Sequence, residues 1–275
     1  NCDQDFAISV IADRSINRKK VNIENVQLLS DVLSVVDSDC NLVIELIGGT
    51  DIAYDLVKKA INNGKSVITA NKALIAEHGD ELFTLSRQKN VYLGFEAAVA
   101  GAIPIIHTLT HNMQNENILS ISGIINGTCN YILDQMTSEN KSFSDALANA
   151  QKLGYAESDP TFDIGGFDAA HKISILAMLA YSMNSPYQNV FIEGIESIES
   201  MDIDYADELG YKIKHIGLVK AVASTIECRV HPVLIHKSNI FSNVDGVMNA
   251  IRIVGDKFGT SMLYGHGAGG EATAS

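Results

Sequence analysis

The feature that most constrains the fold is an alternation of short apolar runs with a helix-like stretch in the first part of the chain. The runs rich in β-branched residues are 6–12 (FAISVIA), 41–47 (NLVIELI) and 66–70 (SVITA), and the segment 52–64 (IAYDLVKKAINNG) has a helical pattern. Strands that alternate with helices are typical of βαβ units, whose strands run parallel. The pattern therefore predicts an α/β protein built on a parallel sheet.

Polar residues directly follow two of these runs, with DRS at 13–15 and GGT at 48–50. Open parallel sheets of the Rossmann type bind nucleotide cofactors at the carboxyl ends of their strands. Asp13 suits the ribose 2′-hydroxyl of NAD and Arg14 the 2′-phosphate of NADP, so both cofactors stay open. The alternative interpretation of DRS is an ordinary polar turn. The candidate cofactor contacts are Asp13, Arg14, Gly48, Gly49 and Thr50.

The pattern changes near residue 105. Helix-like segments dominate to about residue 184, with Ser142 and Asp145 at a predicted helix start. The β-rich runs 225–235 and 246–254 follow without a crossover helix between them. These features predict a second domain of the α+β type, with the domain boundary between residues 104 and 105.

Residues 265–270, GHGAGG, match the spacing G-x-G-x-x-G of a dinucleotide-binding loop. Such a loop opens a βαβ unit and is followed by an acidic residue about 20 positions later, whereas only five residues follow here. We therefore interpret this segment as a loop of another kind. No further strand with a glycine-rich turn precedes the run 6–12, so we expect this run to be the second strand of the sheet, with the N-terminal part of the sheet missing.

Composition disfavours several classes of function. The formal net charge of −13 argues against binding to nucleic acid phosphates, and the apolar run 173–181 is too short to span a membrane. The four cysteines lie far apart without a C-x-x-C pair, which argues against a zinc site or a disulfide framework. We expect a globular cytoplasmic protein without nucleic acid or membrane partners.

The segment 154–172, GYAESDPTFDIGGFDAAHK, places four carboxylates and one lysine directly before the apolar run 173–181. Asp168 and Lys172 are spaced i, i+4, so on a helix their side chains share one face. An exposed pair of this kind contributes little, but the helix that follows is apolar almost all round, which places its first turn near the interior. Because burial lowers the pKa of a lysine, Lys172 is a candidate proton donor or acceptor positioned by Asp168.

Three acids upstream, Glu157, Asp159 and Asp163, lie in a loop where their carboxylates can converge on one cation. That cation is either a metal ion or a substrate ammonium. The spacing fails the D-x-[DN]-x-[DN]-G pattern of a calcium loop, which favours an amino-acid substrate. His107 and His111 have the i, i+4 spacing of zinc ligands, but without a third ligand we interpret them as helix-surface residues.

Two further segments carry candidate site residues. Lys72 follows the run 66–70 and so belongs to the same sheet edge as the GGT turn, or alternatively begins a helix in solvent. Asn126, Gly127 and Thr128 end a predicted strand, and the amides of such a strand-to-helix turn can hold a carboxylate. The alternative there is a plain turn in which Thr128 caps a helix.

Five segments in this order and spacing resemble the homoserine dehydrogenase family: TANKALIA, FEAAVAGAIPII, GIINGTCNYIL, GYAESDPTFDIGGFDAAHK and YGHGAGGEATAS. The resemblance covers nearly the whole chain. It implies a homodimer that reversibly reduces L-aspartate 4-semialdehyde to L-homoserine with NADH or NADPH, in the route to threonine, methionine and isoleucine. It also implies a nucleotide-binding domain over 1–104, which 265–275 rejoins, and a catalytic and dimerisation domain over 105–264.

The resemblance also implies roles for individual residues. Lys172 would give a proton to the aldehyde oxygen, Asp168 would orient it, and Lys72 would be a second lysine near the reacting groups. The substrate would be held by Glu157, Asp163, Tyr155, Asn126, Gly127 and Thr128. Lys72 and Gly267 would join the cofactor contacts. Glu96, Val99 and Gly101 would bind a monovalent cation, Na⁺ or K⁺.

Two other interpretations of the sequence stay open. The first is a related two-domain dehydrogenase that acts on another amino-acid aldehyde or ketone. The second is a catalytically degenerate relative that binds amino acids or cations through its acidic loop. Turnover of NAD(P)H with aspartate semialdehyde separates the three.

Overall fold

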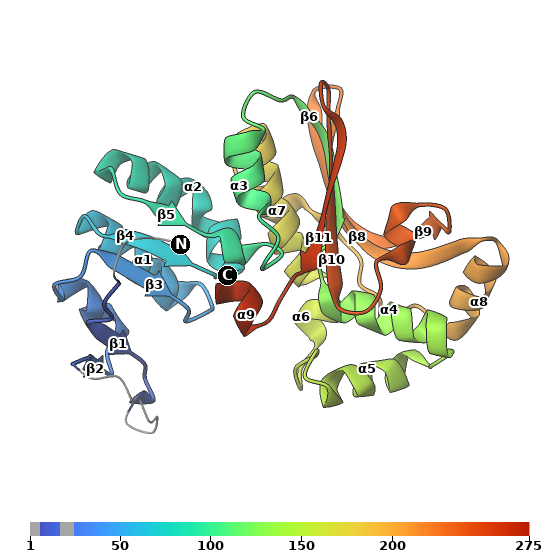
Figure 1. Ribbon diagram of the computed structural model, residues 1–275, viewed down its shortest axis with the longest axis horizontal. Helices are drawn as coiled ribbons and strands as arrows, with labels where there is room; N and C mark the ends of the chain where they lie inside the picture. Colours follow the sequence, from blue (N-terminus) through green and yellow to red (C-terminus); the bar gives the residue numbers. More distant parts are fainter. Residues whose placement is uncertain (1–5, 17–24, 275) are drawn as a thin grey trace. The chain divides into compact units, whose positions relative to one another are not determined.

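The structure is a computed structural model that describes residues 6–16 and 25–274, and it divides into two units (Figure 1). The first unit ends at Phe95 and the second begins at Glu96. Residues 96–104 therefore fold with the second unit, and so do residues 265–274. One reason is a main-chain hydrogen bond from Ala102 N to His266 O (3.1 Å), which ties these two segments to each other.

The first unit contains two small parallel sheets. Strand β1 (Val10–Ala12) pairs with β2 (Gln27–Leu29). Strands β3 (Leu42–Glu45), β4 (Ser66–Thr69) and β5 (Leu93–Gly94) form the other sheet in that order. The predicted parallel pairing is confirmed. Within the described ranges β1 is not paired with β3, so the DRS and GGT turns follow strands of two different sheets and not of one, as the sequence had led us to expect.

Helices α1 (Asp51–Asn62) and α2 (Lys72–Lys89) alternate with the strands of the β3-β4-β5 sheet, and the short 3₁₀ helix η2 (Val32–Asp37) precedes it. The buried residues of α1 recur at helical spacing, which gives the helix one apolar stripe. That stripe packs with strand residues into the core of this unit. The helix residues concerned are Ala53, Leu56, Val57, Ala60 and Ile61.

The second unit is built on a six-stranded mixed sheet of order β11-β10-β6-β8-β9-β7 (Figure 1). Its neighbouring strands are antiparallel except for β7 and β9, which are parallel. The predicted α+β sheet is confirmed, and the runs 225–235 and 246–254 correspond to β9 and β10. Strand β8 was not predicted, because buried polar residues such as Lys214 and His215 interrupt its apolar pattern. The strands are β6 (Ile118–Ile124), β7 (Phe191–Ile192), β8 (Tyr211–Val222), β9 (Thr225–His236), β10 (Met248–Gly255) and β11 (Gly259–His266).

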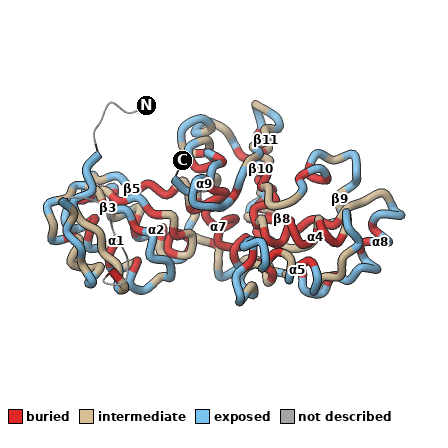
Figure 2. The backbone as a smooth tube through the Cα atoms, turned by 60° about the horizontal axis from the view of Figure 1, so that its bottom comes forward, coloured by how far each residue is buried: buried red, intermediate tan, exposed pale blue. Residues whose placement is uncertain are grey.

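Helices α4 (Gly127–Glu139) and α7 (Phe167–Tyr181) pack against this sheet, and both are largely buried (Figure 2). The other α-helices are α3 (Ile105–His107), α5 (Phe143–Lys152), α6 (Thr161–Ile164), α8 (Ser200–Glu208) and α9 (Gly270–Ala274). Short turns of helix are η3 (Glu96–Ala98), η4 (Thr108–Asn112), η5 (Tyr187–Asn189) and η6 (Ile240–Asn243).

Local signals in the sequence fix some of the helix ends. Ser142 caps α5 as predicted, since its hydroxyl oxygen accepts the N–H of Asp145 at 3.2 Å. Helix α7 ends at Tyr181, before Pro186. In the part of the chain that the structure describes, no helix combines the length and apolar character of a membrane span.

Candidate active site

The site is built where strand β6 ends and helices α4 and α7 begin. Asn126 caps the start of α4, and its side-chain nitrogen donates to two carboxylates at once. Asn126 Nδ2 lies 2.8 Å from Asp163 Oδ1 and 2.8 Å from Asp168 Oδ2. Two acids of the segment 154–172 therefore meet at the first turn of α4.

Lys172 completes this cluster from one turn further along α7. Its ammonium donates to Asp168 Oδ2 at 2.7 Å and to the main-chain oxygen of Ile125 at 2.8 Å. Lys172 is 8% exposed and Asp168 3%, so the face of α7 that carries this pair is buried, as the apolar helix predicts. A buried ion pair with additional hydrogen bonds holds both side chains in one geometry.

The charges of the cluster do not cancel. Asp163 and Asp168 contribute two carboxylates and Lys172 one ammonium, which leaves an excess of negative charge when all three are ionised. Burial, followed by the negative charge of Asp168, raises the pKa of Asp163, and the hydrogen bond from Asn126 opposes the rise. A cationic group that enters the site relieves this repulsion, so the arrangement favours a ligand that carries an ammonium.

The first turn of α4 is shaped by close contacts. Asn126 Oδ1 accepts the N–H of Cys129 at 2.8 Å, so Asn126 is the helix cap, and the predicted alternative of a cap by Thr128 is wrong. The Thr128 hydroxyl instead donates to the main-chain oxygen of Tyr155 at 2.7 Å. A Cβ on Gly127 would lie 2.8 Å from the main-chain oxygen of Val247, so this position requires glycine.

The remaining acids of the loop lie differently. Glu157 and Asp159 have exposed side chains. Asp159 accepts the N–H of Thr161 at 3.1 Å, and this hydrogen bond shapes the loop. Tyr155 is 44% exposed, and its ring packs edge-on against Tyr131 with centroids 5.0 Å apart. Of the three upstream acids predicted to converge, the hydrogen bonds bring Asp163 to the buried pair.

In the first unit, some of the candidate cofactor residues follow the ends of β3 and β4: Gly48, Gly49 and Thr50 come after β3, and Lys72 comes after β4. The turn after β3 is held by Glu45, a fully buried carboxylate that accepts from Ile47 N (2.6 Å), Gly48 N (3.3 Å) and Thr69 Oγ1 (2.5 Å). The amide of Asn71 donates to the main-chain oxygen of Gly49 at 2.6 Å. Sequence reasoning missed Glu45, although a lone acid inside the apolar run NLVIELI was the available signal.

The other predicted positions of this unit are exposed or lie at element ends. Thr50 precedes α1, and Lys72 is the first residue of α2. Asp13 accepts from both the main-chain N–H and the hydroxyl of Ser15 at 2.7 Å, and Arg14 is exposed. The DRS segment thus forms a polar turn, and its role as a cofactor contact stays a prediction.

The residues predicted to bind a monovalent cation lie close together in the second unit. The carboxylate of Glu96 accepts the N–H groups of Ile106 (2.8 Å) and His107 (2.9 Å), so it caps α3. Gly101 has φ +49°, and a Cβ there would lie 2.9 Å from the main-chain oxygen of Gly267. The GHGAGG segment begins with the last two residues of β11, an antiparallel strand, and so does not open a βαβ unit.

Metal-binding side chains do not cluster in the described ranges, where no group of three or more His, Cys, Asp or Glu residues could hold an ion. His107 and His111 are exposed on α3 and η4, with stacked rings 4.3 Å apart. Cys40, Cys129 and Cys228 are free thiols. Burial raises the pKa of Cys129 well above its usual value, with the charges of Asp163 and Asp168 adding to the rise.

A unit with parallel strands, followed by a mixed-sheet unit with a buried lysine–aspartate pair at a helix start, defines a two-unit α/β protein of the nucleotide-binding class. Residues 104–275 match the homoserine dehydrogenase family, and residues 2–96 match the NAD binding domain of homoserine dehydrogenase. The chain belongs to the homoserine dehydrogenase family.

Similar proteins agree with this assignment. A homoserine dehydrogenase of Pseudomonas aeruginosa is 49% identical over 249 residues, which is 90% of this chain and 57% of that protein. The structure of a homoserine dehydrogenase from Thiobacillus denitrificans is 47% identical with a TM-score of 0.89, covering 91% of this chain and 58% of that one. A hyperthermophilic archaeal homoserine dehydrogenase in complex with NADPH is 26% identical with a TM-score of 0.79, covering 98% and 93% of the two chains. The chain thus spans somewhat more than half the length of the first two relatives.

Proposed function

We propose that this protein catalyses the reversible, NAD(P)-dependent reduction of L-aspartate 4-semialdehyde to L-homoserine. The observation that carries the proposal is the buried cluster in which Asn126 joins Asp163 to Asp168 and Asp168 holds Lys172. The substrate carries an ammonium, a carboxylate and an aldehyde, and the site offers acids, helix N–H groups and one ammonium that match them.

Each group of the substrate has a partner in this arrangement. Asp163, with Glu157 on the exposed loop, would hold the substrate ammonium, which the negative site favours. The first turn of α4, at Gly127 and Thr128, would direct N–H groups at the carboxylate. Lys172 has three N–H donors and uses two of them for Asp168 and Ile125, so one remains for the aldehyde oxygen. As the aldehyde is reduced, Lys172 gives that oxygen a proton, and Asp168 keeps the amine in position.

The cofactor, when bound, supplies the hydride. Gly48 and Gly49 have φ values of +77° and +71°, and a Cβ at either would meet nothing within 4 Å, so their backbone leaves room for a ligand. We assign the cofactor contacts to Asp13, Arg14, Gly48, Gly49, Thr50, Lys72 and Gly267. The NADPH complex of the archaeal relative supports NADP, with NAD as the alternative.

Three further properties belong to the same proposal. A monovalent cation, Na⁺ or K⁺, would bind main-chain oxygens near Val99 and Gly101, because the carboxylate of Glu96 already accepts two N–H groups. The protein would act as a homodimer. Free thiols at Cys129 and Cys228 suit the reducing cytoplasm.

The test uses the complete gene product. NADPH or NADH oxidation is followed with aspartate semialdehyde and with other small aldehydes, and activity confined to aspartate semialdehyde supports the proposal. Binding of homoserine without turnover would instead indicate a catalytically degenerate relative. Glu157→Gln is expected to raise the KM for homoserine by about 10-fold, since an ion pair to the substrate ammonium is lost, and an unchanged KM removes Glu157 from the site.

A further inference from the structure

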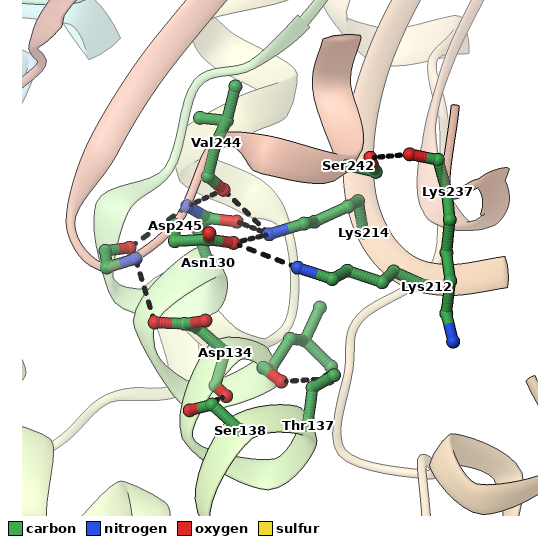
Figure 3. A network of polar contacts seen from close by, with 12 residues as sticks. Asn130, Asp134, Thr137, Ser138, Lys212, Lys214, Lys237, Ser242, Val244 and Asp245 are labelled. Atoms are coloured by element: carbon green, nitrogen blue, oxygen red, sulfur yellow. Dashed lines mark hydrogen bonds and ion pairs between the residues drawn. The ribbon is translucent and has the colours of Figure 1, made fainter. Parts of the chain in front are cut away.

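A buried lysine lies outside the residues that the proposed reaction uses. Lys214 on β8 is 2% exposed, and its ammonium donates to the main-chain oxygen of Val244 at 2.6 Å, to Asp245 Oδ1 at 3.1 Å and to Asn130 Oδ1 at 3.2 Å (Figure 3). Burial lowers the pKa of Lys214, and the charge of Asp245 opposes this effect. Burying a charge costs free energy unless the charge is paired and hydrogen-bonded, so these contacts hold the Lys214 ammonium in one place.

What Lys214 holds is the segment 244–247, which leads into β10. The segment is also bound by α4: Asn130 Nδ2 donates to the main-chain oxygens of Val244 and Gly246, both at 2.9 Å. Asp134 Oδ2 accepts the N–H of Gly246 at 3.0 Å (Figure 3). Lys214 therefore ties strand β8, helix α4 and this segment together at one point.

The same helix carries the substrate residues at its start. Asn126, Asn130 and Asp134 are spaced by four residues, so they follow one face of α4. Asn126 reaches the carboxylates of the proposed active site, and the next two reach the segment 244–247. A shift of the segment against α4 is therefore transmitted along this face to Asn126.

A direct steric contact links the segment to the first turn of α4. The main-chain oxygen of Val247 lies where a Cβ of residue 127 would be, 2.8 Å away, so it backs Gly127. The Val244 side chain is buried in an apolar cluster with Ile216 and Phe241, which anchors the other end of the segment. The segment thus acts as a fixed wall behind the turn that is proposed to hold the substrate carboxylate.

We propose that Lys214 is a positioning residue of the substrate site: through Val244, Asp245 and Asn130 it fixes the segment 244–247 against Gly127, and so sets the place of Asn126. Lys214 touches neither substrate nor cofactor in this arrangement. The kinetic consequence rests on the proposed homoserine dehydrogenase activity, whereas the structural consequence does not.

The chain offers a matched control on the same strand. Lys212 lies 3.5 Å from Asp245 Oδ1 and is 24% exposed, so it shares the acid with Lys214 at a longer distance and nearer the solvent. Lys214→Met and Lys212→Met remove the same charge from neighbouring positions. Comparing the two variants separates the loss of the contacts that join β8, α4 and the segment 244–247 from the loss of a positive charge.

The first arm of the test measures steady-state kinetics of the complete gene product. Lys214→Met is expected to raise the KM for homoserine by about 10-fold while the KM for the cofactor changes by less than about 2-fold, and Lys212→Met is expected to match the wild type. Gly127→Ala is then introduced into the wild type and into Lys214→Met. Because Lys214→Met releases Val247, the added methyl is expected to cost several-fold less activity in that background than in the wild type.

The second arm needs no turnover. Amide hydrogen exchange is expected to quicken at 127–130 and 244–248 in Lys214→Met and not in Lys212→Met. Unchanged exchange there, or equal losses of substrate and cofactor affinity, would overturn the proposal. Absence of turnover in the wild type, with the exchange difference present, would overturn the proposed function and leave the positioning role standing.

A milder variant covers the case in which Lys214→Met does not fold. Asp245 is half-exposed, and Asp245→Asn keeps its shape while removing the charge that Lys214 faces. The expected result is a smaller change in the same direction, about 3-fold in the KM for homoserine. If Asp245→Asn leaves the KM for homoserine at the wild-type value, Lys214 has no positioning role.

Discussion

Lys172 Nζ and Asp168 Oδ2 lie 2.7 Å apart, one turn from each other on α7, in a place that is almost closed to solvent. The i, i+4 spacing creates the pair, and the apolar remainder of the helix buries it. Asn126 then ties Asp168 to Asp163, so a single amide nitrogen sets the distance between two acids. The proposed proton source and the carboxylate proposed to bind the substrate ammonium therefore stand side by side.

Removal of the lysine amine tests the proton source. Lys172→Ala is expected to lower kcat by about 1000-fold in both directions, because the proposed proton donor to the substrate oxygen is lost. Cofactor affinity, measured by titration of NADPH fluorescence, is expected to stay within about 2-fold of the wild type. Lys152→Ala, an exposed lysine at the end of α5, serves as control. Near-normal turnover in Lys172→Ala would rule out the assigned role.

Removal of a single negative charge tests the ammonium site. Asp163→Asn is expected to raise the KM for homoserine by about 10- to 100-fold, because the substrate ammonium loses a charge-assisted hydrogen bond in a buried place. The control is Asp159→Asn, which changes an exposed acid of the same loop. If both variants weaken homoserine binding equally, the effect comes from the charge of the loop and not from a contact at Asp163.

The same residue predicts a dependence on pH. Because the pKa of Asp163 is raised, this carboxylate takes up a proton at a higher pH than an ordinary aspartate and then loses its hold on an ammonium. The KM for homoserine is therefore expected to rise in the wild type as the pH falls through the raised pKa of Asp163. In Asp163→Asn the KM is expected to change little over the same range, as followed by initial rates.

The sequence predicts the parts of this site that are local. The pair Asp168–Lys172 follows from helical spacing, and the start of α4 follows from the strand-to-helix turn at 126–128. Long-range contacts are not visible in this way, since the bond from Asn126 to Asp168 joins residues 42 positions apart. Spacing also cannot tell which acid of a loop points inward, which is why Asp159 was grouped with Asp163.

Buried polar residues on strands are hidden for a related reason. In a sequence, Lys214 and Glu45 look like solvent-facing positions, because charged residues usually are exposed. The fold shows that hydrogen bonds offset the cost of burying each charge. Lys214 bonds to the segment 244–247, and Glu45 bonds to the turn after β3. We propose that the geometry of the two predicted ligand sites depends on these two residues.

A change at Glu45 tests whether the turn at 47–49 takes part in cofactor binding. Glu45→Gln keeps the size of the side chain but removes its charge. It also leaves one acceptor oxygen fewer for the hydrogen bonds that Ile47, Gly48 and Thr69 donate. We expect the KM for NADPH to rise by about 10-fold with the KM for homoserine unchanged, because the turn at 47–49 loosens. Glu81→Gln, which breaks an exposed ion pair with Lys58, is the control and is expected to be silent. Equal effects on both substrates would show general destabilisation instead.

His215 predicts a loss of stability in acid. His215 is 3% exposed, and its Nε2 lies 3.0 Å from the main-chain oxygen of Glu193; because a carbonyl oxygen only accepts, Nε2 is the donor of this hydrogen bond. Burial lowers the pKa of His215 from 6.5 to about 4, and the hydrogen bond to Glu193 opposes this effect.

The sign follows from the two pKa values. Between pH 6.5 and about 4 the unfolded chain binds a proton at His215 that the folded protein refuses, so the free energy of unfolding falls as the pH falls through this range. At pH 5 the loss relative to pH 7.5 is about 2 kcal/mol from this residue. His215→Gln, whose amide can donate to Glu193 without titrating, is expected to lose about 2 kcal/mol less than the wild type between these pH values in urea denaturation. Because the other titrating groups are common to both proteins, their effects cancel in the difference, and parallel losses in the two proteins would show that His215 is protonated in the folded state.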